Sequence, residues 1–164
     1  MKTIKNKSRR SQSRRRRNRK TRASHETRKM PQNGNKSRIV VRFLEILNMI
    51  KLYHWKTRSY SQHKATDELY DKMNENIDKF VEVLLGKDQS RLTLLEKKMN
   101  LSDGSSGSSS FQKSEFQDRL LEFRKFLVGL DRYFDDLGDS DLMNIRDEIL
   151  ADLNQFLYLM SFDK

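Results

Sequence analysis

The sequence contains no cysteine among its 164 residues. A disulfide framework, a thiolate metal site and a thiol nucleophile are therefore excluded, and an intracellular compartment is the natural expectation. Long apolar runs are also lacking, since no stretch approaches about 18 consecutive apolar residues, so we expect no contact with a membrane. The basic N-terminus is not followed by an apolar segment, which argues against a secretory signal. We therefore expect a protein that is neither secreted nor membrane-bound.

Acidic residues are almost absent from the first 38 positions, where 16 basic residues accompany a single acid, Glu26. Residues 39–164 carry 18 basic and 22 acidic residues. The net charge of +11 is thus divided between a strongly basic segment and a mildly acidic remainder. High charge with few apolar residues predicts that residues 1–38 form a disordered tail. Residues 39–164 are then expected to form one domain.

Apolar residues recur at steps of three and four in the remainder of the chain, which predicts amphipathic helices. The pattern covers four segments, residues 39–58, 62–85, 111–134 and 141–161. Ser140 is the expected N-cap of the last helix, and the Ser/Gly-rich residues 102–110 predict a flexible loop. No segment alternates with a period of two, so no sheet is expected. Two helices, a long crossover and two further helices predict an all-α, ferritin-like four-helix bundle.

The second predicted helix carries metal-ligand residue types on one stripe beside its apolar face. At about 100° per residue these side chains span about 100° of the helix; they are His63, Asp67, Asp78 and Glu82. They form two pairs with a spacing of four residues, whose centres lie about 22 Å apart at about 1.5 Å per residue. One metal ion cannot reach both pairs within one chain.

A two-fold axis near residue 72 would resolve this separation. It would set the His63–Asp67 pair of one chain against the Asp78–Glu82 pair of an antiparallel copy, giving two identical sites. His54, near the end of the first predicted helix, could complete each site. Imidazole and carboxylate without thiolate suit iron or manganese, and zinc less well. The alternative is that acids beside an apolar stripe form an ordinary solvated helix edge.

These residues resemble one known family, the Dps-type mini-ferritins, which are ferritin-like four-helix proteins that oxidise iron and often protect DNA. The resemblance rests on His54-Trp55, His63, Asp67-Glu68-Leu69-Tyr70, Asp78 and Glu82. It implies a ferroxidase site across a two-fold interface, with metal ligands His54, His63, Asp67, Asp78 and Glu82. It also places Trp55 and Glu68 near that site, although core packing is an equal alternative for Trp55. The family forms hollow dodecamers, so a homo-oligomer, at least a two-fold dimer, is expected.

The sequence departs from the family pattern in two places. The gap of nine residues between His54 and His63 is shorter than is usual in the family. Lys64 stands where the family often has an acid beside the second histidine. Both departures favour a second hypothesis, in which the protein is an architectural, virion- or DNA-packaging bundle that has lost iron oxidation.

The tail contains a dense basic run without interleaved aromatic residues. Its members are Arg9, Arg10, Arg14, Arg15, Arg16, Arg17, Arg19, Lys20 and Arg22. Such a run predicts salt-sensitive binding to nucleic acid without sequence preference or base stacking, and it is also typical of a nuclear-localisation signal. A nucleus, a nucleoid or a viral DNA compartment is therefore expected. The alternatives are a solubilising tail and one that binds RNA or anionic lipid.

A third hypothesis concerns acids near the junction of the third and fourth predicted helices. They are Asp131, Asp135, Asp136, Asp139 and Asp141. They could recruit a partner or, by the family resemblance, line a cation-entry pore. The alternative is a solvated loop with acids that favour the start of a helix.

Overall fold

The computed structural model describes residues 33–92, 98–99, 101, 109–134 and 138–162, and these residues form four α-helices. They are α1 (Asn33–Lys56), α2 (Tyr60–Gly86), α3 (Ser109–Val128) and α4 (Ser140–Met160), with the 3-10 helix η1 (Gly129–Arg132) after α3. The described residues contain no strand, which confirms the prediction of an all-α fold. None of the helices in the described ranges is long and apolar enough to cross a membrane.

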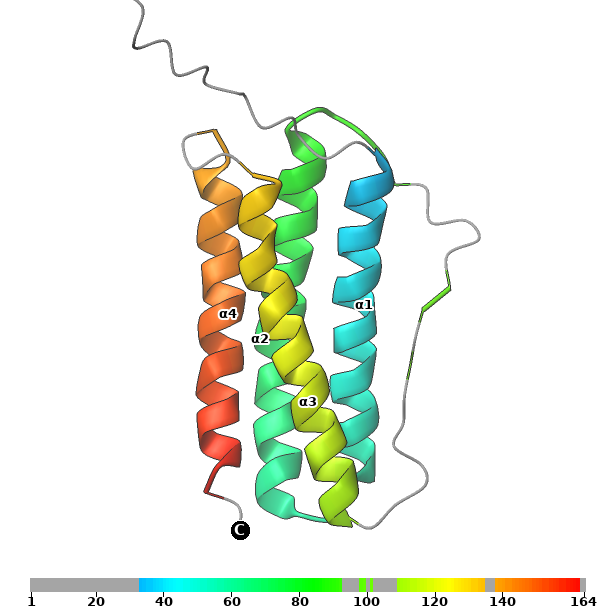
Figure 1. Ribbon diagram of the computed structural model, residues 1–164, viewed down its shortest axis with the longest axis vertical. Helices are drawn as coiled ribbons and strands as arrows, with labels where there is room; N and C mark the ends of the chain where they lie inside the picture. The colour runs from blue at the N-terminus through cyan, green and yellow to red at the C-terminus, as the bar shows by residue number, and fades with distance from the viewer. Residues whose placement is uncertain (1–32, 93–97, 100, 102–108, 135–137, 163–164) are drawn as a thin grey trace, which may run out of the picture.

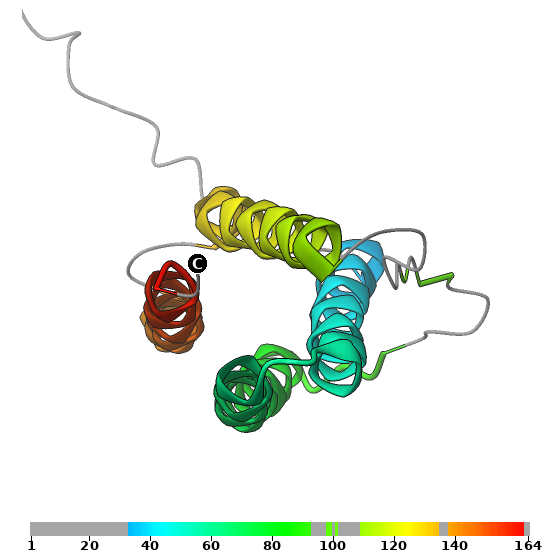
Figure 2. The same cartoon turned by 90° about the horizontal axis from the view of Figure 1, so that it is seen from below.

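The helices form a bundle with one long connection (Figure 1). Helix α1 runs antiparallel to α2, whereas α2 and α3 both begin at the lower end in Figure 1 and are parallel. The chain between Gly86 and Ser109 must therefore return along the whole length of the bundle, as the predicted crossover requires. Seen along its axis, each helix packs beside two others, with α1 opposite α4 and α2 opposite α3 (Figure 2).

Phenylalanine rings organise the centre of the core. Phe43 of α1 is fully buried, and its ring meets Phe80 of α2 edge-to-face at 5.2 Å between centroids. Phe123 of α3 lies 6.0 Å from Phe43 in a similar orientation, and Phe134 lies 6.0 Å from Phe80. Each such pair is worth about 0.5–1.5 kcal/mol beyond simple burial. The predicted apolar positions of α2 are all buried.

The boundary predicted between tail and domain is wrong, because α1 begins at Asn33 and not at residue 39. Lys36, in the first turns of α1, is only 1% exposed. Its ammonium donates to Asp88 Oδ2 at 2.5 Å, to Ser90 Oγ at 3.1 Å and to Leu84 O at 3.4 Å. The last carbonyls of a helix lack partners within the helix, so Lys36 joins the start of α1 to the end of α2. The sequence pattern missed this role because lysine is normally exposed.

Three smaller expectations also need correction. The last two residues of the predicted loop at 102–110 belong to α3, and residues 102–108 lie outside the described residues. The third helix ends as the 3-10 helix η1 at Arg132. Ser140 is the first residue of α4 and not its N-cap, which is Asp139. The Asp139 carboxylate makes no cap hydrogen bond, because it lies 3.1 Å from the ammonium of Lys87.

The contact between Lys36 and Asp88 predicts that stability depends on acid pH. Hydrogen bonds from Lys36, and next from Ser90, lower the pKa of Asp88 from 3.8 to about 2. A carboxyl group with a lowered folded-state pKa stabilises the fold above its unfolded-state pKa, and the contribution is lost as the pH falls through the folded value. We therefore expect Asp88→Asn to destabilise the protein at neutral pH, and the difference from wild type to shrink between about pH 4 and pH 2.

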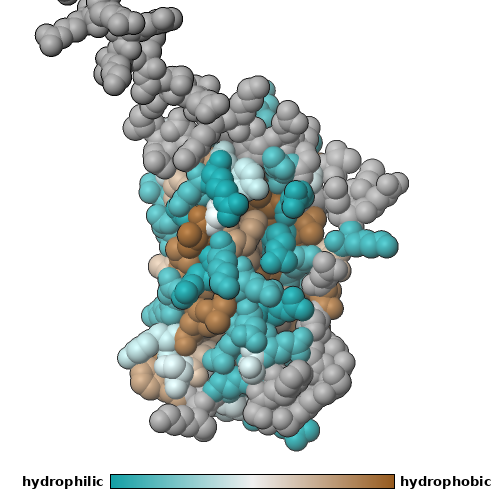
Figure 3. Space-filling view, viewed as in Figure 1, coloured by the Kyte–Doolittle hydropathy of each residue, from teal (hydrophilic) through white to brown (hydrophobic). Residues whose placement is uncertain are grey.

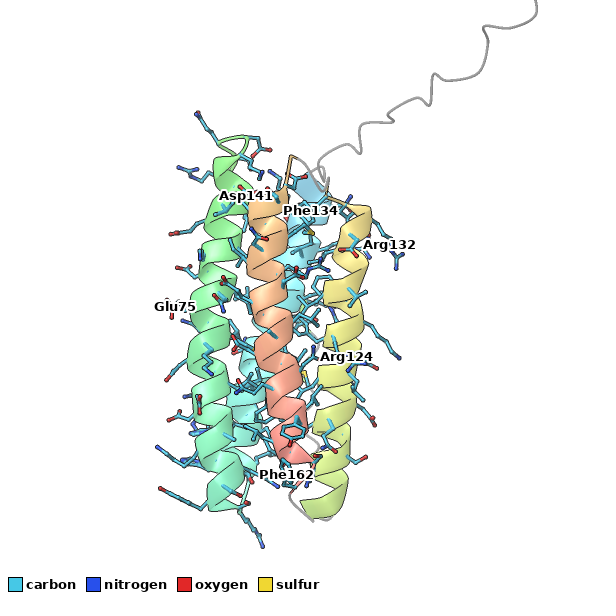
Figure 4. All side chains as sticks on the ribbon, turned by 90° about the vertical axis from the view of Figure 1, so that its left-hand side faces the viewer. Glu75, Arg124, Arg132, Phe134, Asp141 and Phe162 are labelled. Atoms are coloured by element: carbon cyan, nitrogen blue, oxygen red, sulfur yellow. The ribbon has the colours of Figure 1, made fainter. Side chains whose placement is uncertain are left out.

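Urea unfolding of both proteins at several pH values measures this difference. Glu75→Gln is the control for the loss of one negative charge, because Glu75 on α2 points away from the bundle (Figure 4). The same pH profile in both variants would contradict a specific contribution from Asp88.

Candidate metal centre

The turn between α1 and α2 brings the two histidines of the domain together. Helix α1 ends at Lys56 and α2 begins at Tyr60, so three residues connect them. Ser59 is the N-cap of α2, and its hydroxyl accepts a hydrogen bond from the backbone N–H of Gln62. The side-chain oxygen of Gln62 in turn accepts from Tyr53 and Thr57, both at 2.7 Å. These bonds fix the entry of α2 relative to the last turn of α1.

Within this turn, His54 and His63 hydrogen-bond to each other's backbone. His54 Nδ1 lies 3.1 Å from His63 O, and His63 Nδ1 lies 3.0 Å from His54 O. The two imidazole rings stack with 3.8 Å between centroids and 25° between planes. The carbonyl of His54 is among the last four of α1, which have no partner within the helix. His63 therefore satisfies the end of α1 while its own position is fixed.

The reciprocal bonds define the tautomer of both rings. A carbonyl oxygen can only accept a hydrogen bond, so Nδ1 must carry the hydrogen in each imidazole. When the rings are neutral, Nε2 of each keeps its lone pair and these bonds leave it unused. Metal-binding histidines typically have this arrangement, in which one ring nitrogen donates to a carbonyl and the other is the ligand. Thr66 supports it, since its buried hydroxyl lies 3.3 Å from His54 Nδ1.

Asp67 is the third predicted ligand that the fold places at this position. Its Oδ1 lies 3.9 Å from His54 Nε2, one turn along α2 from His63. An ion bound at about 2.1 Å from each atom can bridge a nitrogen and an oxygen up to about 4.2 Å apart. The fold places His54 beside both His63 and Asp67 at one end of the bundle, despite the short gap between the histidines.

A lysine missed by sequence reasoning also lies at this group. Lys51 Nζ is 4.0 Å from Asp67 Oδ1 and 4.6 Å from the centre of the Tyr70 ring. Lys51 precedes His54 by one helical turn, and this spacing is the signal that could have indicated it. Its ammonium would compete with a metal ion for the Asp67 carboxylate.

The two residues predicted near the site both face solvent. Trp55 is 68% exposed, so the alternative of core packing is wrong for this residue. Glu68 is exposed on α2, where its carboxylate lies 3.0 Å from the ammonium of Lys72. Neither side chain completes a ligand set within the single chain.

Asp78 and Glu82, the remaining predicted ligands, lie farther along α2 and are exposed. The fold does not bring them to His54, His63 or Asp67 of the same chain, as the helical spacing requires. Within the described residues of one chain, no three histidine, aspartate or glutamate side chains form a group placed to hold a metal ion. The chain thus carries two separate halves of the predicted ligand set.

The acids near the start of α4 are held by basic side chains. Lys87 Nζ lies 2.9 Å from Asp141 and 3.1 Å from Asp139, and its hydrogen bond lowers the pKa of Asp141. Asp131 lies 2.8 Å from the guanidinium of Arg146, which also donates to the end of α3. These ion pairs favour a structural role for the described acids. The other members of the cluster lie outside the described residues: Asp135 and Asp136.

The predicted nucleic-acid-binding residues, Arg9 to Arg22, also lie outside the described residues. Their segment joins the domain at Asn33, at the upper end of α1 in Figure 1. The two histidines lie at the opposite, lower end of α1. The point where this segment joins α1 is therefore about 30 Å from the histidine pair, at about 1.5 Å per residue of helix.

Fold and site together define an all-α bundle with a histidine–carboxylate group at one end. Residues 54–160 match the model of a family of unknown function, DUF5856. The chain belongs to this family. The matched region begins at His54 and includes all of α2, α3 and α4. Searches of curated proteins and of solved structures find no match for the chain.

The reciprocal bonds predict the tautomer of the two rings in solution. When neutral, both His54 and His63 are expected to carry the hydrogen on Nδ1, because a carbonyl accepts at that nitrogen in each. Long-range proton–nitrogen correlation spectra distinguish the two tautomers directly. Thr66→Val removes the hydroxyl near His54 but keeps both carbonyls, so the tautomers should not change. A hydrogen on Nε2 of either neutral ring would show that the reciprocal arrangement is wrong.

Proposed function

We propose that the protein binds and oxidises ferrous iron at a site shared by two chains, in the manner of a Dps-type mini-ferritin, and associates with nucleic acid through its basic tail. The observation that carries the first part is the histidine pair. Both rings use Nδ1 for a backbone carbonyl, which leaves Nε2 as the donor atom for a metal, and His54 Nε2 lies 3.9 Å from Asp67. Imidazole and carboxylate suit iron.

Iron is the substrate of the proposed reaction. Each ferrous ion loses one electron to an oxidant, either oxygen or peroxide. With peroxide, two ferrous ions and two protons give two ferric ions and two waters. The protein supplies ligands that hold ferrous iron and stabilise the ferric product, and needs no nucleophile.

The second chain supplies the other half of the ligand set. Asp78 and Glu82 are exposed on α2, and at about 100° per residue they lie on the same side of the helix as Asp67. Helix α2 packs against α1 and α4 of its own chain, which leaves its outer face available to a copy. A two-fold axis near the middle of α2 pairs the two halves twice. The exposure of Trp55, next to His54, supports an interface at this end of the bundle.

One observation favours the architectural alternative. Lys51 Nζ lies 4.0 Å from Asp67 Oδ1, where a metal ion would otherwise neutralise the carboxylate. An ammonium in this position can replace the charge of the ion and keep the bundle stable without it. In that case the protein would package nucleic acid and leave iron unchanged. Iron oxidation separates the two functions, whereas binding to DNA does not.

The test of a shared site is complementation between two inactive variants. His63→Ala and Asp78→Ala should each oxidise ferrous iron more slowly than wild type, because each removes one ligand. In a mixed dimer both lesions can fall in the same site, so the opposite site stays intact. Mixing the two variants under conditions of subunit exchange should therefore restore part of the rate, measured by ferric absorbance. Glu75→Ala is the matched control for loss of an exposed acid on α2.

Two results would contradict this proposal. Wild-type protein that oxidises iron no faster than buffer would favour the architectural function. Loss of activity in both variants without recovery on mixing would show that a two-fold interface does not combine the two ligand halves. Light scattering confirms that dimers are present, and native mass spectrometry of the mixture detects the mixed dimers that exchange produces.

The tail is tested by charge removal in the full chain. Replacing four arginines by glutamine should weaken binding to duplex DNA equally for different sequences; the four are Arg14, Arg15, Arg16 and Arg17. Each lost phosphate contact should reduce the slope of log affinity against log salt by about 0.9. Electrophoretic mobility shifts at several salt concentrations measure both effects. An unchanged salt slope would show that the tail does not contact phosphate.

A further inference from the structure

A pocket lies between the first half of α1 and the end of α3, at the end of the bundle where α1 begins. Its volume is about 450 Å³, within the range of about 300–1,000 Å³ typical of small-molecule sites. Helix α1 supplies one wall, and α3, η1 and the residue after η1 supply the other. Hydrophilic side chains surround hydrophobic patches on the face shown in Figure 3.

The walls of this pocket are strongly basic. Five cationic residues line it with a single acid, Glu45; they are Arg38, Arg42, Lys98, Lys125 and Arg132. Glu45 lies 2.9 Å from Arg42, so this acid is already neutralised. Among the described residues, none forms an ion pair with the other four cations. Within the described residues, the pocket therefore presents more positive than negative charge.

Aromatic rings complete the lining. Phe126 is held from behind by Phe43 at 6.0 Å and by Phe123 at 5.7 Å between centroids. The guanidinium of Arg42 lies 5.9 Å from the centre of the Phe126 ring. Tyr133 is 39% exposed, so part of its ring is open to a ligand.

Gly129 provides room for one of the cations. A Cβ atom at this position would lie 3.4 Å from Arg132 Nη2, so the guanidinium lies directly over the glycine. Arg132 is near the end of the bundle that also contains Phe134 (Figure 4). Arg132 and Tyr133 are consecutive residues, so the pocket wall has a phosphate-binding group next to an aromatic ring.

We infer that this pocket binds a nucleotide. Guanidinium and ammonium groups bind phosphate through charge-assisted hydrogen bonds, with Arg38, Lys125 and Arg132 as the available donors. A base stacks on exposed aromatic rings, for which Tyr133 is the available surface. The volume accommodates one base with its sugar and phosphate. The basic tail of the same chain is repelled by these cations, which argues against it as the occupant.

The inference extends the proposed association with nucleic acid, because it gives the folded domain a phosphate contact separate from the tail. It does not depend on iron oxidation.

Two sources supply the same chemistry, a free nucleotide or one unit of a single strand. An acidic surface of a second copy is a different occupant, which the experiment must detect.

The experiment titrates the full chain with adenosine monophosphate. The backbone N–H signal of Gly129 should shift on binding, because this residue lines the pocket. Replacing Arg38 and Arg132 together by glutamine should weaken binding by at least about tenfold, since two charge-assisted bonds are lost. Both side chains are exposed, so the core is not altered. The four-arginine tail variant, which loses twice as many charges, should bind the nucleotide like wild type.

A second pair of variants tests the role of the ring. Tyr133→Leu should weaken adenosine monophosphate binding by about tenfold, because stacking on the base is lost, and should leave binding of inorganic phosphate unchanged. Tyr133→Phe keeps the ring and should bind like wild type. A site for phosphate alone would show no difference between these two variants.

Three results would overturn the inference. The first is an unchanged affinity in the Arg38 and Arg132 double variant. The second is loss of binding in the tail variant alone, which would assign all phosphate binding to the tail. The third is a shift of the Gly129 signal with protein concentration and not with nucleotide, which would assign the pocket to a second copy.

The source of the nucleotide follows from a further comparison. An adenylate single strand is titrated into the tail variant, with and without the two pocket substitutions. A weaker affinity with the substitutions would identify a unit of a strand as the ligand. An unchanged affinity, with loss of monophosphate binding, would identify the free nucleotide. If the proposed tail function is wrong, the tail variant will show an unchanged slope of log affinity for duplex DNA against log salt. That result is independent of nucleotide binding in the pocket.

Discussion

The short turn between α1 and α2 is the constraint on which the rest of the bundle depends. Only three residues join the two helices, so their relative position is fixed where they meet. The crossed hydrogen bonds of His54 and His63 satisfy a carbonyl at the end of α1 and lock the two backbones together. With this end fixed, the apolar stripe of α2 faces inward along its length, and Phe80 reaches the ring of Phe43. A substitution at either histidine thus acts on the helix pair as well as on a ligand.

The same geometry explains why the acidic stripe of α2 remains open. The helix uses its apolar stripe for α1 and α4, and α3 lies diagonally across the core. Asp78 and Glu82, which lie beside this stripe, are therefore exposed. Ligand-type residues at such positions can serve a second copy without any rearrangement of the fold. Because α2 is long, the two halves of the predicted ligand set lie far apart along it.

Sequence reasoning predicted the helices well because their stabilisation follows a regular period. Leu69, Met73 and Ile77 were placed on the apolar stripe of the second helix, and all three are buried. The meeting of His54, His63 and Asp67 was predictable for a similar reason, since two of them share a helix face and the third ends the helix before. These contacts are either local or close to a short turn, so they depend on few other parts of the chain.

The features that were missed depend on contacts between distant parts of the chain. Lys36 is buried because it reaches Asp88, a pairing that no local pattern contains. The basic pocket combines Arg38 with Lys125 and Arg132, which belong to opposite walls. A net charge counted over a long segment does not show such a local concentration. Only the packing of α1 against α3 reveals it.

The buried Lys36 also has a mechanical consequence. The basic tail joins the domain three residues before this side chain, so tension applied through the tail reaches α1 at its first turn. A helix end without tertiary contacts unwinds one turn at a time under such a load. Here the load passes from α1 through the Lys36 ammonium to the end of α2, so the force is shared by two helices from the outset. The domain is thereby built to resist being peeled open from the point at which it is tethered.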